Sequence, residues 1–229
     1  MQTLFLTQAV GTNAPNASQD VKVIHQKLMD IGKIPCFTCA GDFDDTVLNG
    51  IKEVQRHYMA VPDGVISVGG RTHGFLNAWK EKPIKSGVQL MGRLKTAWDW
   101  VSPILPDGSN CTSGFRSPAD QRRILHDFYL NTCANLIKAK YGQQKYDLVK
   151  TNLLANEAQV LEMVRGVGQL IAAPGKSMHQ QGKAIDVGGA SSIDQKQVET
   201  IKLVAKAHSD LFNGKVLLER NGCVHFEIK

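Results

Sequence analysis

The residues best suited to metal chemistry lie in one glycine-rich segment, residues 175–189. This segment contains His179 and Asp186, seven positions apart, with Gly182 between them. A histidine in a loop and an aspartate in a strand can converge on one cation if the chain turns at the glycine. Zinc accepts imidazole nitrogen and carboxylate oxygen, and a catalytic zinc site uses three protein ligands and leaves the fourth position to water. We therefore expect a third ligand, for which His225 is the candidate.

The elements that must position these residues are a C-terminal hairpin and the strand and helices around it. Two β-rich runs between Val216 and Ile228 flank Asn221-Gly222, a dipeptide typical of hairpin turns. A short strand is predicted around residues 111–115. Helical spacing and capping residues predict helices near 90–98, after Ser117, at 156–169 and at 194–208, the last with Ser192 and Gln195 as a capping box. Helices packed on an antiparallel sheet make the fold class α+β.

The first 80 residues carry a separate helical pattern. Apolar residues at helical spacing predict one helix through 21–31, a second through 47–58 and a short third helix around Leu76. The stretch 79–87 is polar and charged with Pro and Gly, which is typical of a linker. We therefore predict two domains, a three-helix domain at 1–82 and an α+β domain at 88–229.

Three separated motifs of the second domain carry a resemblance to a known family. They are, in chain order, Ser113-Gly-Phe-Arg-Ser117, Ser177-x-His179-x-x-Gly182-x-Ala184-x-Asp186 and Val224-His225-Phe-Glu. Together they resemble the D-alanyl-D-alanine carboxypeptidase and Hedgehog-type zinc peptidases over residues 88–229. The resemblance implies a zinc cofactor held by His179, Asp186 and His225.

The same resemblance implies roles for residues outside the metal site. It makes Arg116 a catalytic residue that binds or polarises the substrate, since a guanidinium presents a fork of donors to a carboxylate or a developing oxyanion. Gln121 follows at the family's Arg-Ser-x-x-x-Gln spacing and would assist in binding substrate. Ser177 belongs to the ligand motif and is also expected in the substrate site.

A zinc-bound water needs a carboxylate as general base, and two candidates exist, Glu219 and Glu227. In Hedgehog-type members the corresponding Glu lies six residues before the last histidine, which is the spacing of Glu219 and His225. A two-residue turn would point Glu219 away from the face that carries His225. A three-residue loop over 220–222, with its glycine in the left-handed region, would place Glu219 opposite Cys223 on that face. We predict that loop and Glu219 as the base, with Glu227 as the fallback.

The first domain carries a second resemblance, to the three-helix peptidoglycan-binding domain attached to many wall hydrolases. The matching residues are Asp20 to Leu28, Gly41 to Thr46, Ile51 to Gln55, Asp63 to Ile66 and Arg71-Thr72. The two resemblances imply a zinc peptidase like a modular phage endolysin, which hydrolyses an amide of the stem or cross-link peptide of bacterial peptidoglycan. It would act as an endopeptidase or as a D,D- or L,D-carboxypeptidase. An interbacterial effector with this chemistry and a non-catalytic zinc-containing wall-binding module are the alternatives.

The charge and the first residues bear on partners and location. A net charge of +6 suits an anionic polymer such as the cell wall. The basic residues are scattered without a block, so we expect no nucleic-acid partner. The N-terminal residues lack a basic n-region and a long apolar run. We expect a monomer, made in the cytoplasm without a signal peptide or stable membrane insertion, that acts in the periplasm or cell wall after release or injection.

The cysteines do not favour one interpretation. Their number, five, is odd, so they cannot all pair within one chain. The lone C-x-x-C of Cys36 and Cys39 fits half a zinc site, a redox pair, a loop disulfide or two incidental thiols. The sequence leaves open the roles of Cys36, Cys39, Cys111, Cys133 and Cys223.

Overall fold

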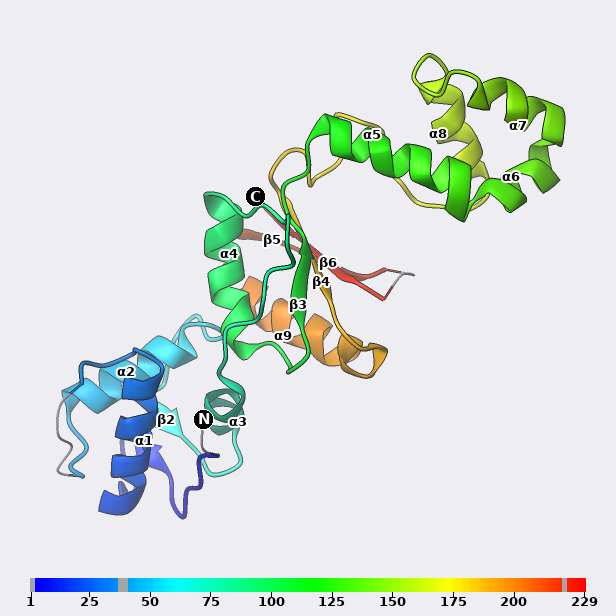
Figure 1. The fold of residues 1–229 in the computed structure, drawn as a ribbon. Coiled ribbons are helices and arrows are strands. Elements are labelled where there is room, and N and C mark those ends of the chain that lie inside the picture. Colours follow the sequence, from blue (N-terminus) through cyan, green and yellow to red (C-terminus); the bar gives the residue numbers. More distant parts are fainter. Residues whose placement is uncertain (1–2, 37–40, 220–221) are drawn as a thin grey trace. The chain divides into compact units, whose positions relative to one another are not determined.

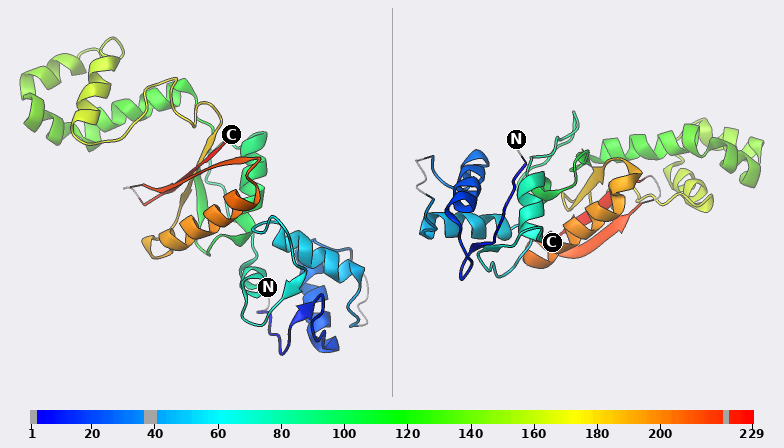
Figure 2. Two further views of the ribbon diagram at one scale, coloured as in Figure 1. Left: turned by 180° about the vertical axis from the view of Figure 1, so that it is seen from behind. Right: turned by 90° about the horizontal axis from the view of Figure 1, so that it is seen from below.

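The fold combines helices with antiparallel sheets, as predicted. The computed structural model describes residues 3–36, 41–219 and 222–229. The chain forms two compact units, one from Met1–Ser113 together with Ile185–Lys229 and the other from Gly114–Ala184 (Figures 1 and 2). The helices and the two sheets confirm the α+β class. The predicted division into domains at 1–82 and 88–229 stays a prediction.

The first unit contains a four-stranded sheet. Its strands are β3 (Asn110–Ser113), β4 (Ala184–Gly188), β5 (Phe212–Leu218) and β6 (Val224–Ile228), in the order β3-β4-β6-β5 (Figure 1). Helices α4 (Arg93–Val101) and α9 (Asp194–Ala207) contact each other and β6. They therefore cover the same face of the sheet.

Alternation along β6 separates the core from the chemistry. Val224, Phe226 and Ile228 are apolar and at most 1% exposed, and Phe226 packs with Phe212 of β5 at a ring-centroid distance of 5.8 Å. Because successive strand residues point to opposite faces, His225 and Glu227 point away from these apolar side chains. One face of β6 thus packs in the hydrophobic core, and the other face carries the titratable side chains of His225 and Glu227.

The first unit also contains the N-terminal helices α1 (Ser18–Asp30), α2 (Asp45–Gln55) and α3 (Arg71–Ala78) and the short strands β1 (Val10–Gly11) and β2 (Val65–Ile66). Six of the eight apolar positions that predicted the first two helices are fully buried, namely Val21, Ile24, Leu28, Val47, Ile51 and Val54. The other two, Ile31 and Tyr58, lie beyond the ends of the helices. Helix α2 begins where the Asp44 carboxylate accepts a hydrogen bond from the backbone N–H of Val47, at 2.9 Å. Hydrophobic burial therefore stabilises these helices.

The second unit is helical, with α5 (Pro118–Asp127), α6 (Ala134–Tyr141), α7 (Gln143–Lys150) and α8 (Glu157–Gly166). Its core contains Tyr129 and Tyr146, whose rings stack at 4.9 Å, and the Tyr129 hydroxyl donates to the Tyr146 carbonyl at 2.8 Å. Ser117 caps α5, as predicted, by accepting from the N–H of Asp120 at 3.1 Å. The sequence reading did not separate α6 and α7 as elements of their own.

The predicted capping box of α9 is wrong. A 3₁₀ turn, Ser191–Ile193, precedes the helix and contains Ser192, so Ile193 becomes the N-cap and no side chain caps the helix. The Gln195 amide bonds instead to Glu199, one turn further along, at 3.2 Å. The extra turn therefore moves Ser192 out of the position from which its hydroxyl could cap.

Four cysteines are described, Cys36, Cys111, Cys133 and Cys223, and the first three are free thiols. Burial raises the pKa of the Cys111 thiol to about 12, which suits a packing role rather than reactivity. Cys39 lies outside the described residues, so the pairing of the C-x-x-C is not described. No helix in the described part of the chain has the length and apolar character needed to cross a membrane.

His57 makes the stability of the first unit depend on pH. Its ring is 4% exposed, donates from Nδ1 to the Trp100 carbonyl at 2.8 Å and contacts Trp79 edge-on. Burial lowers its pKa from 6.5 to about 4, against the opposing effect of that hydrogen bond. Between these two values the unfolded chain binds a proton that the folded chain does not, so stability falls as the pH falls through this window.

We expect this effect to reach about 3 kcal/mol of unfolding free energy by pH 4. Urea unfolding of the wild type and of a His57→Asn variant, at pH 7 and at pH 4.5, would measure it. The variant should lose a smaller part of its stability on acidification, because asparagine does not titrate. Equal losses in both proteins would contradict the assignment.

Candidate metal centre and active site

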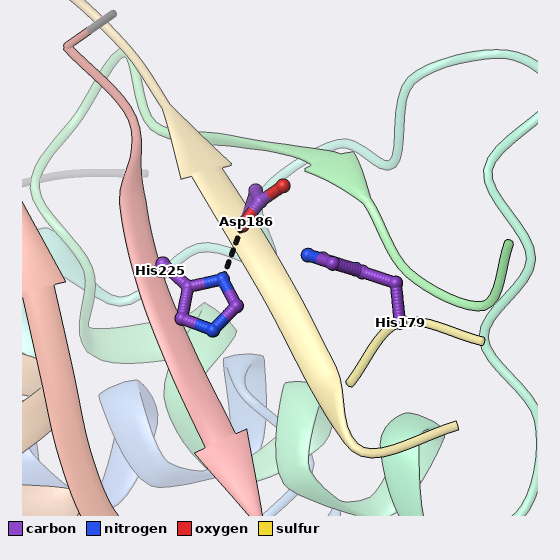
Figure 3. A group of neighbouring side chains, drawn as sticks. All are labelled: His179, Asp186 and His225. Carbon is purple, nitrogen blue, oxygen red and sulfur yellow. Dashed lines mark hydrogen bonds and ion pairs between the residues drawn. The ribbon is translucent and has the colours of Figure 1, made fainter. Parts of the chain in front are cut away.

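His179 lies in the loop that leads from α8 into β4. Its side chain is 5% exposed, and its Nδ1 lies 2.8 Å from the carbonyl oxygen of Gly114. A carbonyl only accepts, so this contact fixes the proton on Nδ1 and leaves Nε2 as the nitrogen that can bind a metal. A close view of the site shows a His179 ring nitrogen directed toward Asp186 (Figure 3).

Asp186 and His225 lie on the sheet. Asp186 is in β4, where it pairs with Ser113 next to an irregularity in β3, and His225 is in β6. The Nδ1 of His225 lies 2.9 Å from Oδ1 of Asp186 (Figure 3). The His225 and Asp186 side chains are 11% and 12% exposed. A buried carboxylate and a buried imidazole thus face each other across neighbouring strands.

The three predicted ligands form one cluster. One ligand atom each from His179, Asp186 and His225 lies within 4.8 Å of the others (Figure 3). Two imidazole nitrogens and one carboxylate oxygen are a donor set that zinc accepts, and three protein ligands leave a position for water. The residues therefore fit a catalytic zinc ion, although their role as ligands stays a prediction.

The electrostatics around His225 favour a positive charge. Burial alone would lower the pKa of its imidazole, but the hydrogen bond and charge of Asp186, with smaller effects of Glu227 and Glu219, raise it above the ordinary value. Carboxylates that stabilise an imidazolium also stabilise a bound cation in the same place. The surroundings of His225 are therefore suited to a metal ion.

The hairpin has the register that the prediction for Glu219 required. Leu217 pairs with His225 and Leu218 with Val224, and the Glu219 N–H donates to the Cys223 carbonyl at 2.8 Å. Residues opposite each other in an antiparallel pair share a face, and so do residues two apart, so Glu219 lies on the His225 face.

The loop that closes this hairpin agrees with the same register. Gly222 has a φ of 80°, in the left-handed region, and its N–H donates to the Glu219 carbonyl at 3.0 Å. The other two loop residues, Arg220 and Asn221, lie outside the described residues. Glu219 lies on the His225 face. The strand register therefore excludes the two-residue turn, which would have pointed the Glu219 side chain away from His225.

Glu227, the fallback base, is 5% exposed and held on three sides. Its carboxylate accepts hydrogen bonds from Lys215 at 2.6 Å, from Asn213 at 2.9 Å and from the His225 Nε2 at 3.3 Å. Burial opposes ionisation of this group, but these bonds keep its pKa below the ordinary value. Glu227 is thus an ionised partner of the His225 ring.

Arg116 and Gln121 form a pair in the helical unit. The Arg116 guanidinium donates to the Gln121 side-chain carbonyl at 3.0 Å, and the buried Gln121 amide donates to the Ala172 carbonyl at 3.0 Å. The Arg116 backbone N–H donates to the His179 carbonyl at 3.2 Å, which links it to the loop of that histidine. Gln121 therefore orients the guanidinium.

Ser177 is 6% exposed and lies in the same loop. Its hydroxyl accepts from the backbone N–H of His179 at 3.3 Å, so it shapes the turn that holds this histidine. The roles of Ser177, Gln121 and Arg116 toward a substrate stay predictions.

The sequence reading missed the partners that hold the histidines. The Gly114 carbonyl has no sequence signal, because any residue offers one. Lys215 and Asn213 could have been found from the hairpin register, since Val216 pairs with Phe226 and cross-strand opposite charges stabilise sheets.

Comparison with known proteins points to one family. Residues 108–213 match the family model of D-alanyl-D-alanine carboxypeptidase. The match includes Arg116, His179 and Asp186 and ends before Glu219 and His225. No curated protein and no solved structure matches the chain significantly.

Proposed function

We propose that the protein is a zinc-dependent peptidase of bacterial peptidoglycan, because residues 108–213 match the family model of D-alanyl-D-alanine carboxypeptidase. It hydrolyses an amide bond of the stem or cross-link peptide. The cluster of His179, Asp186 and His225 carries the zinc part of this proposal, since its three donor atoms lie within 4.8 Å of one another.

The reaction divides between the metal and this chain's own side chains. Bound zinc supplies Lewis-acid polarisation of the scissile carbonyl and lowers the pKa of a water molecule. Glu219 takes a proton from the attacking water and passes it to the leaving amine nitrogen, so that the C–N bond breaks and a carboxylate and an amine form. The hairpin register, which turns Glu219 to the His225 face, supports this catalytic role over a non-catalytic wall-binding module.

Arg116 binds the substrate. Its guanidinium, oriented by Gln121, donates to a substrate carboxylate or to the oxyanion that forms at the attacked carbonyl.

We expect an Arg116→Lys variant to lose about a hundredfold in kcat/KM, because lysine keeps the charge but loses the fork of donors. Its zinc content should equal that of the wild type. Arg122→Lys, on α5 and paired with Glu157 outside the predicted site, is the matched control. Similar losses in both variants would point to a structural role for Arg116.

The remaining features concern where the enzyme works. Helices α1 to α3 would hold it on the wall polymer and raise the local substrate concentration, and the net positive charge suits an anionic wall. We propose action in the periplasm or cell wall, as a phage lysis enzyme or as an effector with the same chemistry.

Synthetic stem peptides test the proposed function. Zinc-loaded protein would be incubated with pentapeptides that end in D-Ala-D-Ala and with a cross-linked dimer, followed by separation of the products. Release of terminal D-Ala would identify a carboxypeptidase, and cleavage of the dimer or within the stem would identify an endopeptidase. No cleavage of any of these peptides by zinc-loaded protein would contradict the proposal.

A further inference from the structure

The two histidines of the cluster share an arrangement that the sequence did not predict. Each has one ring nitrogen facing the cluster and the other facing an acceptor, which is the Gly114 carbonyl for His179 and the Glu227 carboxylate for His225. A metal-binding imidazole needs its second nitrogen protonated and hydrogen-bonded, because this fixes its tautomer and ring orientation.

We propose that Glu227 is a positioning residue that holds His225 with Nε2 protonated and Nδ1 directed at the metal. The inference rests on the proposed function, whose metal centre it deepens. Glu227 lies two residues after His225 on β6 and accepts from its Nε2 at 3.3 Å, while Nδ1 lies beside Asp186 at 2.9 Å. A flipped ring would break both contacts, and a proton on Nδ1 instead of Nε2 would leave the ring no hydrogen to donate to Glu227.

The contacts of Glu227 explain why it serves this purpose and not as the base. Lys215 and Asn213, both on β5, donate to its two oxygens at 2.6 and 2.9 Å, and the side chain is buried. A carboxylate held in this way cannot turn toward a substrate. The contacts from β5 fix the position of the Glu227 carboxylate and, through that carboxylate, the position of the His225 ring. The same strand, β5, leads to Glu219.

The charge of Glu227 is expected to raise the metal affinity of the site by acting on the His225 imidazole. A carboxylate that accepts the second N–H makes an imidazole a more basic ligand, and loss of such a partner typically costs about 10–100-fold in metal affinity. Lys215 is half exposed, so it can stabilise the buried carboxylate without itself entering the metal site.

Zinc affinity, measured by competition with a chromophoric chelator, tests the inference. We expect Glu227→Ala to bind zinc about 10–100-fold more weakly than the wild type, and Glu227→Gln to fall between the two because it keeps an acceptor but loses the charge. Glu162→Gln, on the exposed side of α8, is the matched control and should bind zinc as the wild type does. Wild-type affinity in folded Glu227→Ala would overturn the inference.

A second readout guards against a variant that merely misfolds. In nitrogen-15 spectra of the zinc-loaded wild type, His225 should carry its proton on Nε2 and exchange it slowly, and this signal should exchange faster in Glu227→Gln. A His225 proton on Nδ1 would overturn the inference. Wild-type protein that binds zinc but cleaves no wall peptide would instead refute the proposed function and leave this test intact.

Discussion

A Glu219→Gln variant is expected to bind zinc as the wild type does and to cleave wall peptides about 10²–10⁴-fold more slowly. Glutamine has nearly the same shape as glutamate but cannot accept the proton of the attacking water. The expectation depends on the hairpin register, in which the Glu219 N–H bonds to the Cys223 carbonyl and the side chain shares a face with His225. Steady-state kinetics of stem-peptide cleavage would measure the loss of rate, and metal analysis of the same samples would measure the zinc content.

The matched control for this variant is Glu162→Gln, which removes the same charge from an exposed position on α8. It should retain the activity of the wild type. If Glu219→Gln stays within a few-fold of the wild type, Glu219 is not the base. Zinc loss in Glu219→Gln would assign it to the metal site instead.

The second large effect is expected from His179→Ala, which removes one of three ligands. We expect zinc affinity to fall by more than the roughly 10–100-fold that outer-shell partners contribute, and activity to fall below detection. His126→Ala, which removes a half-buried histidine of α5, is the control and should keep its zinc. Metal analysis after dialysis, together with peptide cleavage, would measure both effects.

The opposite result would be equally informative. A His179→Ala protein that retains stoichiometric zinc would show that the metal lies elsewhere. A chelator-treated wild type that stays active would exclude a role for the metal in cleavage.

The sequence predicted the parts of the fold that depend on periodicity and local chemistry. Apolar spacing predicted α1 and α2, and Ser117 with its following proline predicted the start of α5, since capping needs only neighbouring residues. The glycine in the hairpin loop allowed two registers, and only the spacing of Glu219 from His225 chose between them. The structure has the register that this spacing required.

Other features depend on contacts that local patterns do not contain. The capping box at Ser192 failed because a 3₁₀ turn occupies that position, and a pattern of four residues cannot reveal it. The bonds from Lys215 and Asn213 to Glu227 depend on the pairing of β5 with β6. Sequence motifs predicted the three residues of the cluster, His179, Asp186 and His225, whereas the partners that orient the His225 ring depend on the strand pairing.

The central claim, a zinc peptidase of peptidoglycan, is tested most directly by mass spectrometry of the fragments released from purified peptidoglycan. Zinc-loaded wild type would be compared with chelator-treated protein and with His179→Ala. Peptide fragments released only by the zinc-loaded wild type are the predicted result, and their masses would identify the bond that is cleaved. If the protein carries a full complement of zinc and releases no fragments from the peptidoglycan of several bacteria, the claim is contradicted.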